Sequence, residues 1–210
     1  MAFMKIDIFF DPICPWCYIG KRRLQRALGQ RPTISAELNW RPFMLNPDMP
    51  PQGMERQAYL LHKFGTEARV RRLLGALEAT GQSEEIGFNF DTIHHTPATN
   101  DAHRLIKYAA EHGQGEQVVE SLFRAFFIEG RDIGLFDELS AIGRAAGLDG
   151  GALDSYLDSS LDAEWVTQQN SQAHRLGVNG VPCFLLNGEL ALQGAQQPDI
   201  LARLLDAAAA

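Results

Sequence analysis

The spacing of apolar residues changes period twice along this chain, and the order of the resulting segments limits the folds it can adopt. Short β-branched and aromatic runs near the two ends predict buried strands, at residues 5–10, 34–45, 181–186 and 189–193. Apolar residues recurring at helical spacing predict helices, at residues 15–29, 55–79, 101–112, 116–128, 136–146, 150–158, 163–176 and from Pro198 onward. The order is therefore β-α-β, then a long helical block, then β-β-α.

Local signals sharpen several of these segment ends. Pro15 suits the first turn of a helix, because an N–H at that position would have no acceptor within the helix. Thr99 and Asn100 offer N-cap side chains to the helix expected from residue 101. Asn187-Gly188, between the last two strands, is the dipeptide most typical of a tight β-hairpin.

This order predicts an α/β fold in which a large all-helical domain is inserted into a smaller α/β domain. Neither flanking half has enough elements to cover both faces of a sheet, so the two halves are expected to fold together. The expected α/β domain combines residues 1–46 and 177–210, and the expected inserted helical domain covers residues 47–176.

The composition is that of an ordinary globular protein. A chain of 210 residues with 45% apolar residues can bury a core large enough to fold without a disulfide framework, which three cysteines could not supply. The formal net charge of -7 argues against a nucleic-acid partner, which would need a basic face. No apolar run approaches the roughly 20 residues of a membrane span, so no membrane partner is expected.

The first residues predict a cytoplasmic protein. Met1–Asp7 lack the basic start, the long apolar centre and the small-residue cleavage site of a secretory signal. Structural disulfides are rare in that reducing compartment, so a close cysteine pair points to metal binding, redox chemistry or chance. The sequence leaves the oligomeric state open.

Such a pair stands where the first strand ends and the first helix begins, in Cys14-Pro15-Trp16-Cys17. A disulfide is attacked by a thiolate, and the free N–H groups and positive dipole end of a helix N-terminus stabilise a nearby anion. Cysteines placed in this way ionise with pKa values of about 3.5–7.5. The spacing brings the second sulfur within reach of the first, so Cys14 is the expected nucleophile and Cys17 the expected resolving thiol.

Two alternatives to a redox pair stay open. The first is a zinc half-site, which would need two further ligands. Cys183 and the six histidines show no finger-like spacing, so no metal is expected. The second is a pair of inert buried cysteines.

Trp16 is expected to be partly exposed, forming an apolar rim that receives substrate peptides, and its alternative is a packed core aromatic.

A second candidate feature, Gly180-Val181-Pro182, stands at the start of the third predicted strand. Proline belongs at a strand's first position or on an edge, and X-Pro bonds are where cis peptides occur. A cis proline here would let an extended substrate peptide pair with the backbone of Val181. Cys183 follows and is either a small buried apolar residue or a third redox thiol, since strand alternation can turn it inward or outward.

Several stretches of the chain match one known family. The most specific is Phe9-Phe10-Asp11-Pro12-Ile13-Cys14-Pro15-Trp16-Cys17-Tyr18-Ile19-Gly20-Lys21-Arg22-Arg23-Leu24. The shorter ones are Trp40–Leu45, Ala102–Leu105, Gly180–Phe184 and Gly194–Gln196. Over nearly its whole length the chain thereby resembles the DsbA-type thioredoxin-like family, most closely its cytosolic FrnE-like branch. The resemblance implies a thioredoxin fold with an inserted helical domain, Cys14 as nucleophile, Cys17 as resolving cysteine and Pro182 as the cis proline.

The chain departs from that pattern at two places. Many thioredoxin-like oxidoreductases carry a buried acid on the first strand, at a position that is Ile8 here. Proton transfer to Cys17 is therefore expected to use Asp7, Asp11 or water. The residues between the cysteines are Pro-Trp rather than Pro-His, so no histidine stabilises a thiolate there, and we expect a less oxidising couple than that of DsbA.

The expected activity is thiol–disulfide exchange with protein or small-molecule thiols and disulfides, without a bound cofactor and with glutathione as a candidate co-substrate. The first alternative is a glutathione-dependent isomerase or transferase, of the chromene-carboxylate isomerase or kappa-transferase type. Those relatives carry Ser where this chain has Cys14, so the intact Cys14/Cys17 pair favours the oxidoreductase. A redox-responsive chaperone is the other alternative.

Two further groups of side chains are expected to serve the fold or solubility rather than chemistry. The histidines His94, His95 and His103 are expected to lie in a solvated loop or in packing positions. The basic run Lys21-Arg22-Arg23 is expected to form a solvated face of the first helix.

Overall fold

The structure, a computed structural model, describes residues 2–209. It consists of two compact units, one formed by the residues up to Phe43 together with those from Gln168 onward, and one running from Met44 to Thr167. A domain in the strict sense folds on its own, so the predicted domain boundaries stay a prediction.

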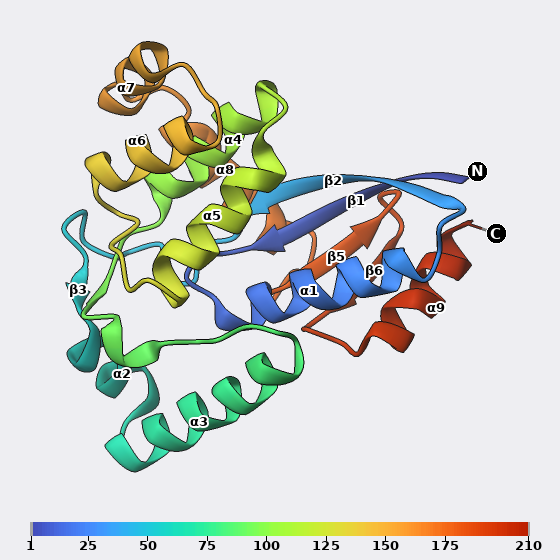
Figure 1. The fold of residues 1–210 in the computed structure, drawn as a ribbon, viewed down its shortest axis with the longest axis horizontal. Helices are drawn as coiled ribbons and strands as arrows, with labels where there is room; N and C mark the ends of the chain where they lie inside the picture. The colour runs from blue at the N-terminus through green and yellow to red at the C-terminus, as the bar shows by residue number, and fades with distance from the viewer. Residues whose placement is uncertain (1, 210) are drawn as a thin grey trace. The chain divides into compact units, whose positions relative to one another are not determined.

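The first unit is built on a four-stranded mixed sheet of order β2-β1-β5-β6 (Figure 1). Its strands are β1 (Ala2–Phe10), β2 (Ile34–Pro42), β5 (Cys183–Leu186) and β6 (Leu190–Gln193). β2 runs parallel to β1, which requires a crossover connection, and β5 and β6 complete the sheet in antiparallel pairs. The central strand β1 buries Met4, Ile6 and Ile8 and its last residues, Phe9 and Phe10, whereas Phe3 is 63% exposed and Lys5 is also exposed.

Two helices of this unit pack against each other beside the sheet: α1 (Pro15–Gly29), which is the β1–β2 crossover, and α9 (Pro198–Ala209). A third, α8 (Ala163–Arg175), begins in the second unit and ends in the first. The predicted hairpin between the last two strands is confirmed. Asn187 and Gly188 have φ values of 50° and 77°, and the N–H of Glu189 donates to the carbonyl of Leu186 at 3.0 Å.

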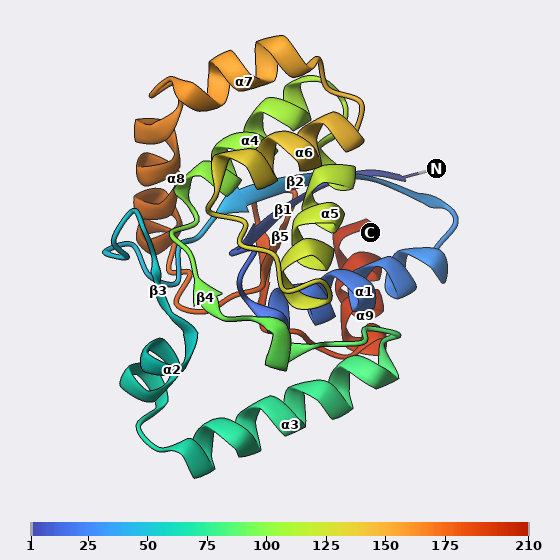
Figure 2. The same ribbon diagram turned by 60° about the vertical axis from the view of Figure 1, so that its left-hand side comes forward.

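The second unit is mainly helical, as predicted (Figure 2). Its helices are α2 (Arg56–Phe64), α3 (Glu67–Ser83), α4 (Asn100–Glu111), α5 (Gly115–Phe127), α6 (Phe136–Ala145) and α7 (Gly150–Asp158), with a short 3₁₀ turn at Phe90–Thr92. Helices α4, α5 and α6 contact one another. Their shared core includes the fully buried Leu105, Leu122 and Phe126.

Three local expectations in this unit need correction. The single helix expected over residues 55–79 is in fact two helices. Gly65, with a φ of 92°, ends α2, and the hydroxyl of Thr66 accepts the N–H of Arg69 and so caps the start of α3. The unit also has a short antiparallel ladder of β3 (Met54–Glu55) and β4 (His95–Thr96), which the helical pattern did not indicate. Thr99 precedes α4 but its side chain makes no capping hydrogen bond.

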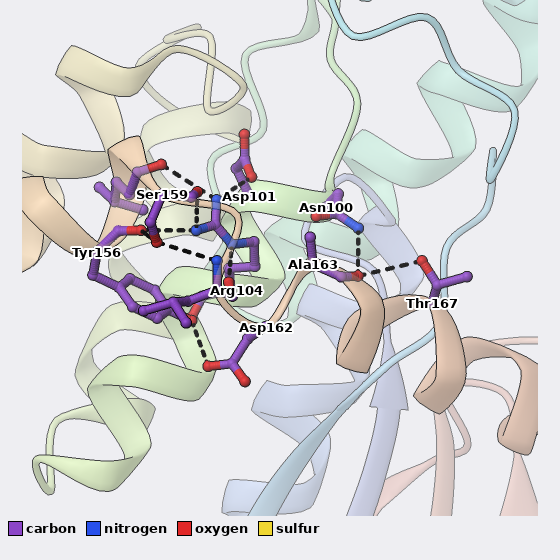
Figure 3. A network of polar contacts seen from close by, with 10 residues as sticks. Asn100, Asp101, Arg104, Tyr156, Ser159, Asp162, Ala163 and Thr167 are labelled. Carbon is purple, nitrogen blue, oxygen red and sulfur yellow. Dashed lines mark hydrogen bonds and ion pairs between the residues drawn. The ribbon is translucent and has the colours of Figure 1, made fainter.

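A buried arginine holds the end of α7 in this unit (Figure 3). Arg104, on α4, donates to the carbonyl oxygens of Tyr156, Ser159 and Leu161 at 2.8, 2.7 and 2.6 Å, and pairs with Asp101 at 2.7 Å. The last carbonyls of a helix have no partner within the helix, so a cation that donates to them stabilises its C-terminus. Arg104 is therefore a structural residue.

Candidate functional site

Cys14 is the residue that caps the N-terminus of α1. Its backbone is extended, and its carbonyl accepts the N–H of Cys17 at 3.0 Å and that of Tyr18 at 3.4 Å. Pro15 occupies the first turn of the helix as expected, and the N–H of Cys14 donates to the carbonyl of Asp11 at 2.9 Å. Cys14 thus stands at the N-terminal end of α1, which is the positive end of the helix dipole.

Cys17 forms a close pair with Cys14. The two thiols are hydrogen-bond partners, and both are free rather than disulfide-bonded. Burial raises the pKa of Cys17 well above the usual range, and the hydrogen bond and charge of Cys14 raise it further. Cys17 is therefore held as a thiol at neutral pH, which suits a group that acts after the first attack rather than in it.

The loop before β5 lies beside the first of these sulfurs. The Val181–Pro182 peptide bond is cis, and the Cys14 thiol points at the carbonyl of Val181 with an S–O distance of 3.9 Å. Residues far apart in the sequence are thus brought to one place: Cys14 and Cys17 from α1, and Val181 and Pro182 from the loop.

Gly20 makes this arrangement possible, and sequence reasoning did not single it out. A Cβ at Gly20 would lie 2.6 Å from Cγ of Pro182 and 3.3 Å from Cζ of Phe184. No side chain fits between α1 and the loop at this point. The available signal was a glycine inside a helical pattern, which often marks a close approach of another segment.

Trp16 is 38% exposed, which confirms the expected partial exposure and excludes a packed core aromatic. Its role as a rim that receives substrate stays a prediction. Its neighbour Pro15 is partly buried. The indole is thus available to an incoming apolar side chain.

The two acids considered for proton transfer have different surroundings. Asp11 is fully buried in the β1–α1 connection, where one carboxylate oxygen accepts the N–H of Ile13 at 3.3 Å. Asp7, on β1, is partly exposed and accepts a hydrogen bond from Arg41 at 3.0 Å in an ion pair. Asp11 affects the pKa of Cys17 in two opposite ways: a hydrogen bond with its backbone lowers that pKa, and its charge raises it by a smaller amount.

Cys183 begins β5, where it pairs with Phe9 on one side and Gln193 on the other. Its side chain is buried and its thiol is free. Burial raises the pKa of Cys183 to about 11, so the thiolate that redox chemistry requires is scarce at neutral pH. A role for Cys183 in exchange stays a prediction.

The basic run on α1 is not a solvated face, which corrects that expectation. Lys21 and Arg23 are buried, and Arg23 donates to the carbonyl of Ala195 at 2.6 Å. Arg22 is partly exposed, but it donates to the Tyr18 hydroxyl at 3.1 Å and stacks over that ring. The segment after β6 therefore covers this side of the helix, which the local sequence could not indicate.

The histidines occupy packing and loop positions. His103 is buried, and burial lowers its pKa to about 3, so its ring is neutral. His95 pairs with Asp132 at 2.8 Å, and His94 is exposed. Within residues 2–209, no three side chains of His, Cys, Asp or Glu converge as metal ligands would. In the same part of the chain, no helix combines the length and apolar character needed to cross a bilayer.

Comparisons with known proteins agree with this geometry. A family model described as a DSBA-like thioredoxin domain matches residues 5–206. The crystal structure of the probable DsbA oxidoreductase SCO1869 from Streptomyces coelicolor is 28% identical, with a TM-score of 0.88 over 98% of this chain and 89% of that one.

Two more distant structures share the fold alone. The cytosolic disulfide reductase DsbM from Pseudomonas aeruginosa is 22% identical, with a TM-score of 0.66 over 97% of both chains. A 2-hydroxychromene-2-carboxylate isomerase is 21% identical, with a TM-score of 0.68 over 97% of this chain and 93% of that one.

Proposed function

Because this chain belongs to the DSBA-like thioredoxin domain family, we propose that it is a thiol–disulfide oxidoreductase with Cys14 as nucleophile and Cys17 as resolving thiol. The same match confirms the predicted thioredoxin-like α/β fold with its helical insertion. One observation carries the proposal: two free, hydrogen-bonded thiols stand at the N-terminus of α1, beside the cis-proline loop.

The reaction is two successive exchanges. The Cys14 thiolate attacks one sulfur of a substrate disulfide, which forms a mixed disulfide and releases the other substrate sulfur as a thiolate. Cys17 then gives up its proton and attacks the Cys14 sulfur, which releases the second substrate thiolate. The substrate gains two electrons, and the protein is left with a Cys14–Cys17 disulfide. The reverse sequence oxidises a dithiol substrate.

The substrate surface consists of the Trp16 indole and the Val181 backbone. Val181 offers its backbone beside the nucleophile, where the Cys14 thiol already points at its carbonyl. Trp16 supplies exposed apolar area next to the same sulfur. An extended peptide segment around a cysteine fits both features, and so does a small disulfide.

Glutathione is the proposed co-substrate, and neither a metal nor a bound cofactor is needed, because both electrons are carried by sulfur. DsbM, which shares the fold, is described as a cytosolic disulfide reductase and has also been solved with glutathione. This likeness supports glutathione as the thiol that resets the pair, and the cytoplasm as the place of action. Fractionation of cells carrying the tagged full-length protein tests the location.

The second candidate is a glutathione-dependent isomerase, favoured by the fold shared with a 2-hydroxychromene-2-carboxylate isomerase. That chemistry uses the thiolate of glutathione and does not need two protein thiols. The raised pKa of Cys17 and its bond to Cys14 are features of a resolving thiol, which the isomerase has no use for. The oxidoreductase is therefore the better supported function.

Reduction of glutathione disulfide and of a protein disulfide, measured with wild type, Cys14→Ser and Cys17→Ser, tests the proposal. We expect Cys14→Ser to lose activity by at least about 1000-fold. Cys17→Ser should accumulate a mixed disulfide at Cys14, visible as added mass. Turnover of an aromatic isomerase substrate by Cys17→Ser with added glutathione, without disulfide reduction by wild type, would establish the alternative.

A further inference from the structure

We propose that a cavity in the helical unit binds a small organic monocarboxylate, with Arg56 as the partner of its carboxylate. The cavity has a volume of about 380 Å³, which lies in the range of small-molecule sites. It is lined by the start of α2, the start of α3 and residues 91–94 (Figure 2). All of these residues belong to the unit from Met44 to Thr167, so the proposal does not depend on the cysteine pair of the other unit.

Arg56, the first residue of α2, lines this cavity and has no counter-ion. It is only 9% exposed, and burial lowers the pKa of its guanidinium. The guanidinium lies over the ring of Phe126, 5.7 Å from the ring centroid, and donates one long hydrogen bond, at 3.4 Å, to the hydroxyl of Thr96. Its buried Nε has no acceptor, and among residues 2–209 no carboxylate forms an ion pair with it.

Arg104, in the same unit, shows how the fold compensates a buried guanidinium when it can. That side chain donates to several backbone carbonyls and pairs with Asp101. A buried charge without such partners is costly, and an arginine does not lose its proton. An anion in the cavity would supply to Arg56 the partner that the fold does not provide.

Apolar side chains form a large part of the cavity wall. Leu60 and Leu61 contribute from α2, Val70 from α3, and Ile93 from the segment that follows the 3₁₀ turn. All of these except Leu61 are buried, so packing holds the wall in place. Such a surface suits a short branched hydrocarbon chain, because the chain is stabilised when it leaves water.

The charged residues of the wall favour a carboxylate over a phosphate. Glu55 is committed to the start of α2, where its two oxygens accept backbone N–H groups at 2.9 and 2.6 Å. Glu67 pairs with Arg71 at 3.6 Å, and Asp91 is exposed. With these three acids beside two arginines, a ligand that carries more than one negative charge is disfavoured. A carboxylate carries one charge, and its two oxygens match two N–H groups of a guanidinium.

Nuclear magnetic resonance of the full-length protein tests the site directly, because the Nε–H of Arg56 has no acceptor in the free protein. The probe is 4-methylpentanoate. One control is 4-methylpentanamide, which has the same shape without the charge, and the other is 3-methylbutyl phosphate, which carries more charge. We expect 4-methylpentanoate to shift the Arg56 Nε–H signal with a Kd of about 1 mM, and both controls to bind at least about tenfold more weakly.

Three results of this titration would overturn the proposal. The first is an Arg56 signal that does not move when the probe is about twentyfold above the expected Kd. The second is equal binding of the amide and the carboxylate, which would leave the guanidinium without a part in binding. The third is tighter binding of the phosphate, which would assign the cavity to another class of ligand.

Arg56→Met distinguishes an arginine that binds a ligand from one that holds the fold. Because it removes an unpaired buried charge, the urea midpoint of the free protein should stay the same or rise. Binding of 4-methylpentanoate, followed through the methyl signals of the probe, should weaken at least about tenfold. Arg72→Met is the matched control, since Arg72 is exposed on α3 and does not line the cavity, and it should keep the wild-type Kd. Unchanged binding in Arg56→Met overturns the proposal.

Leu61→Trp tests the cavity without altering Arg56. Leu61 is half-buried on the wall, so a larger side chain there can occupy the space without displacing a buried neighbour. Binding of 4-methylpentanoate should be lost, and the urea midpoint should stay close to that of wild type. If Arg56→Met does not fold, this variant and the wild-type titration decide, and undiminished binding in Leu61→Trp overturns the proposal. Disulfide reduction is measured separately, so the proposed function and this site can fail independently.

Discussion

Gly20 and Pro182 pack so closely that a methyl group on the glycine would lie 2.6 Å from Cγ of the proline. This contact fixes the loop against α1, one turn from the cysteine pair. In Gly20→Ala, either the helix or the loop has to move. We expect the free energy of unfolding to fall by about 1–3 kcal/mol, as overpacking does elsewhere. Attack by Cys14 should slow as Val181 shifts. Urea unfolding measures the change in stability, and the rate at which Cys14 releases the chromophore of an aromatic disulfide measures the change in attack.

Gly29→Ala is the matched control for that change. Gly29 ends the same helix, and a Cβ there would meet nothing within 4 Å. The substitution reduces the freedom of the unfolded chain, so the free energy of unfolding should stay the same or rise by up to about 1 kcal/mol. If the two alanine variants behave alike, the effect belongs to helix propensity and not to the Pro182 contact.

The redox potential should lie well below the value of about −120 mV that makes DsbA a strong oxidant. A strongly oxidising couple needs a stabilised reduced form. Here no histidine lies between the cysteines, and burial disfavours the Cys17 thiolate. Equilibration with glutathione buffers, followed by alkylation and mass measurement, gives the potential.

The variant Trp16→His tests the cause of that difference. An imidazole beside Cys14 would stabilise the thiolate of the reduced form, so the potential should rise toward more oxidising values. The same glutathione titration measures it. A wild-type potential near that of DsbA, or an unchanged potential in Trp16→His, would contradict this account of the couple.

The cysteine pair was predictable from sequence because its placement depends on neighbouring residues. An extended run ends at Phe10, and a proline stands at the first helical position, so Cys14 has to lie at the helix start. The hairpin at Asn187 was predictable for the same reason, since turn chemistry is local. These signals also sufficed to indicate the fold class.

What the sequence could not show depends on residues far along the chain. Position 20 has to be a glycine because Pro182 packs against it. Arg23 is buried because the segment containing Ala195, whose carbonyl it binds, lies against the helix. Neither partner can be recognised before the sheet is assembled. The ion pair of Asp7 has the same origin, because its partner Arg41 lies on the neighbouring strand β2.

Cys183 should make the oxidised protein sensitive to alkali. With Cys14 and Cys17 joined, it is the remaining free thiol, and burial raises its pKa from 9.0 to about 11. The unfolded chain loses this proton near pH 9 and the folded chain only near 11, so deprotonation favours unfolding between these values. The urea midpoint should hold below pH 9 and fall as the pH rises toward 11.

Cys183→Ala removes this titration and leaves every lysine and tyrosine in place. The fall in the urea midpoint over the same pH window should therefore be smaller in the variant than in wild type. Wild type should also resist alkylation at Cys183 near neutral pH until it unfolds. An equal loss of stability in both proteins would assign the alkaline effect to other groups.

Arg104 should be among the most costly residues of the helical unit to replace. Without its buried guanidinium, the carbonyls of Tyr156, Ser159 and Leu161 would each be left without this donor, at a cost of about 1–3 kcal/mol (Figure 3). We expect Arg104→Met to lower the free energy of unfolding by about 3 kcal/mol or more. Arg104→Lys should recover little of the lost stability, because a single ammonium group cannot reach all the carbonyls that the planar guanidinium group reaches.

Urea unfolding and amide hydrogen exchange test this prediction together. Exchange should accelerate first in residues 156–161, the segment that Arg104 holds. Arg71→Met is the control, since Arg71 belongs to the same unit but is 75% exposed on its side chain and pairs with Glu67 at 3.6 Å. That exposed pair should contribute less than about 1 kcal/mol. Equal destabilisation by the two methionine variants would mean that the buried network has no special part in holding the end of α7.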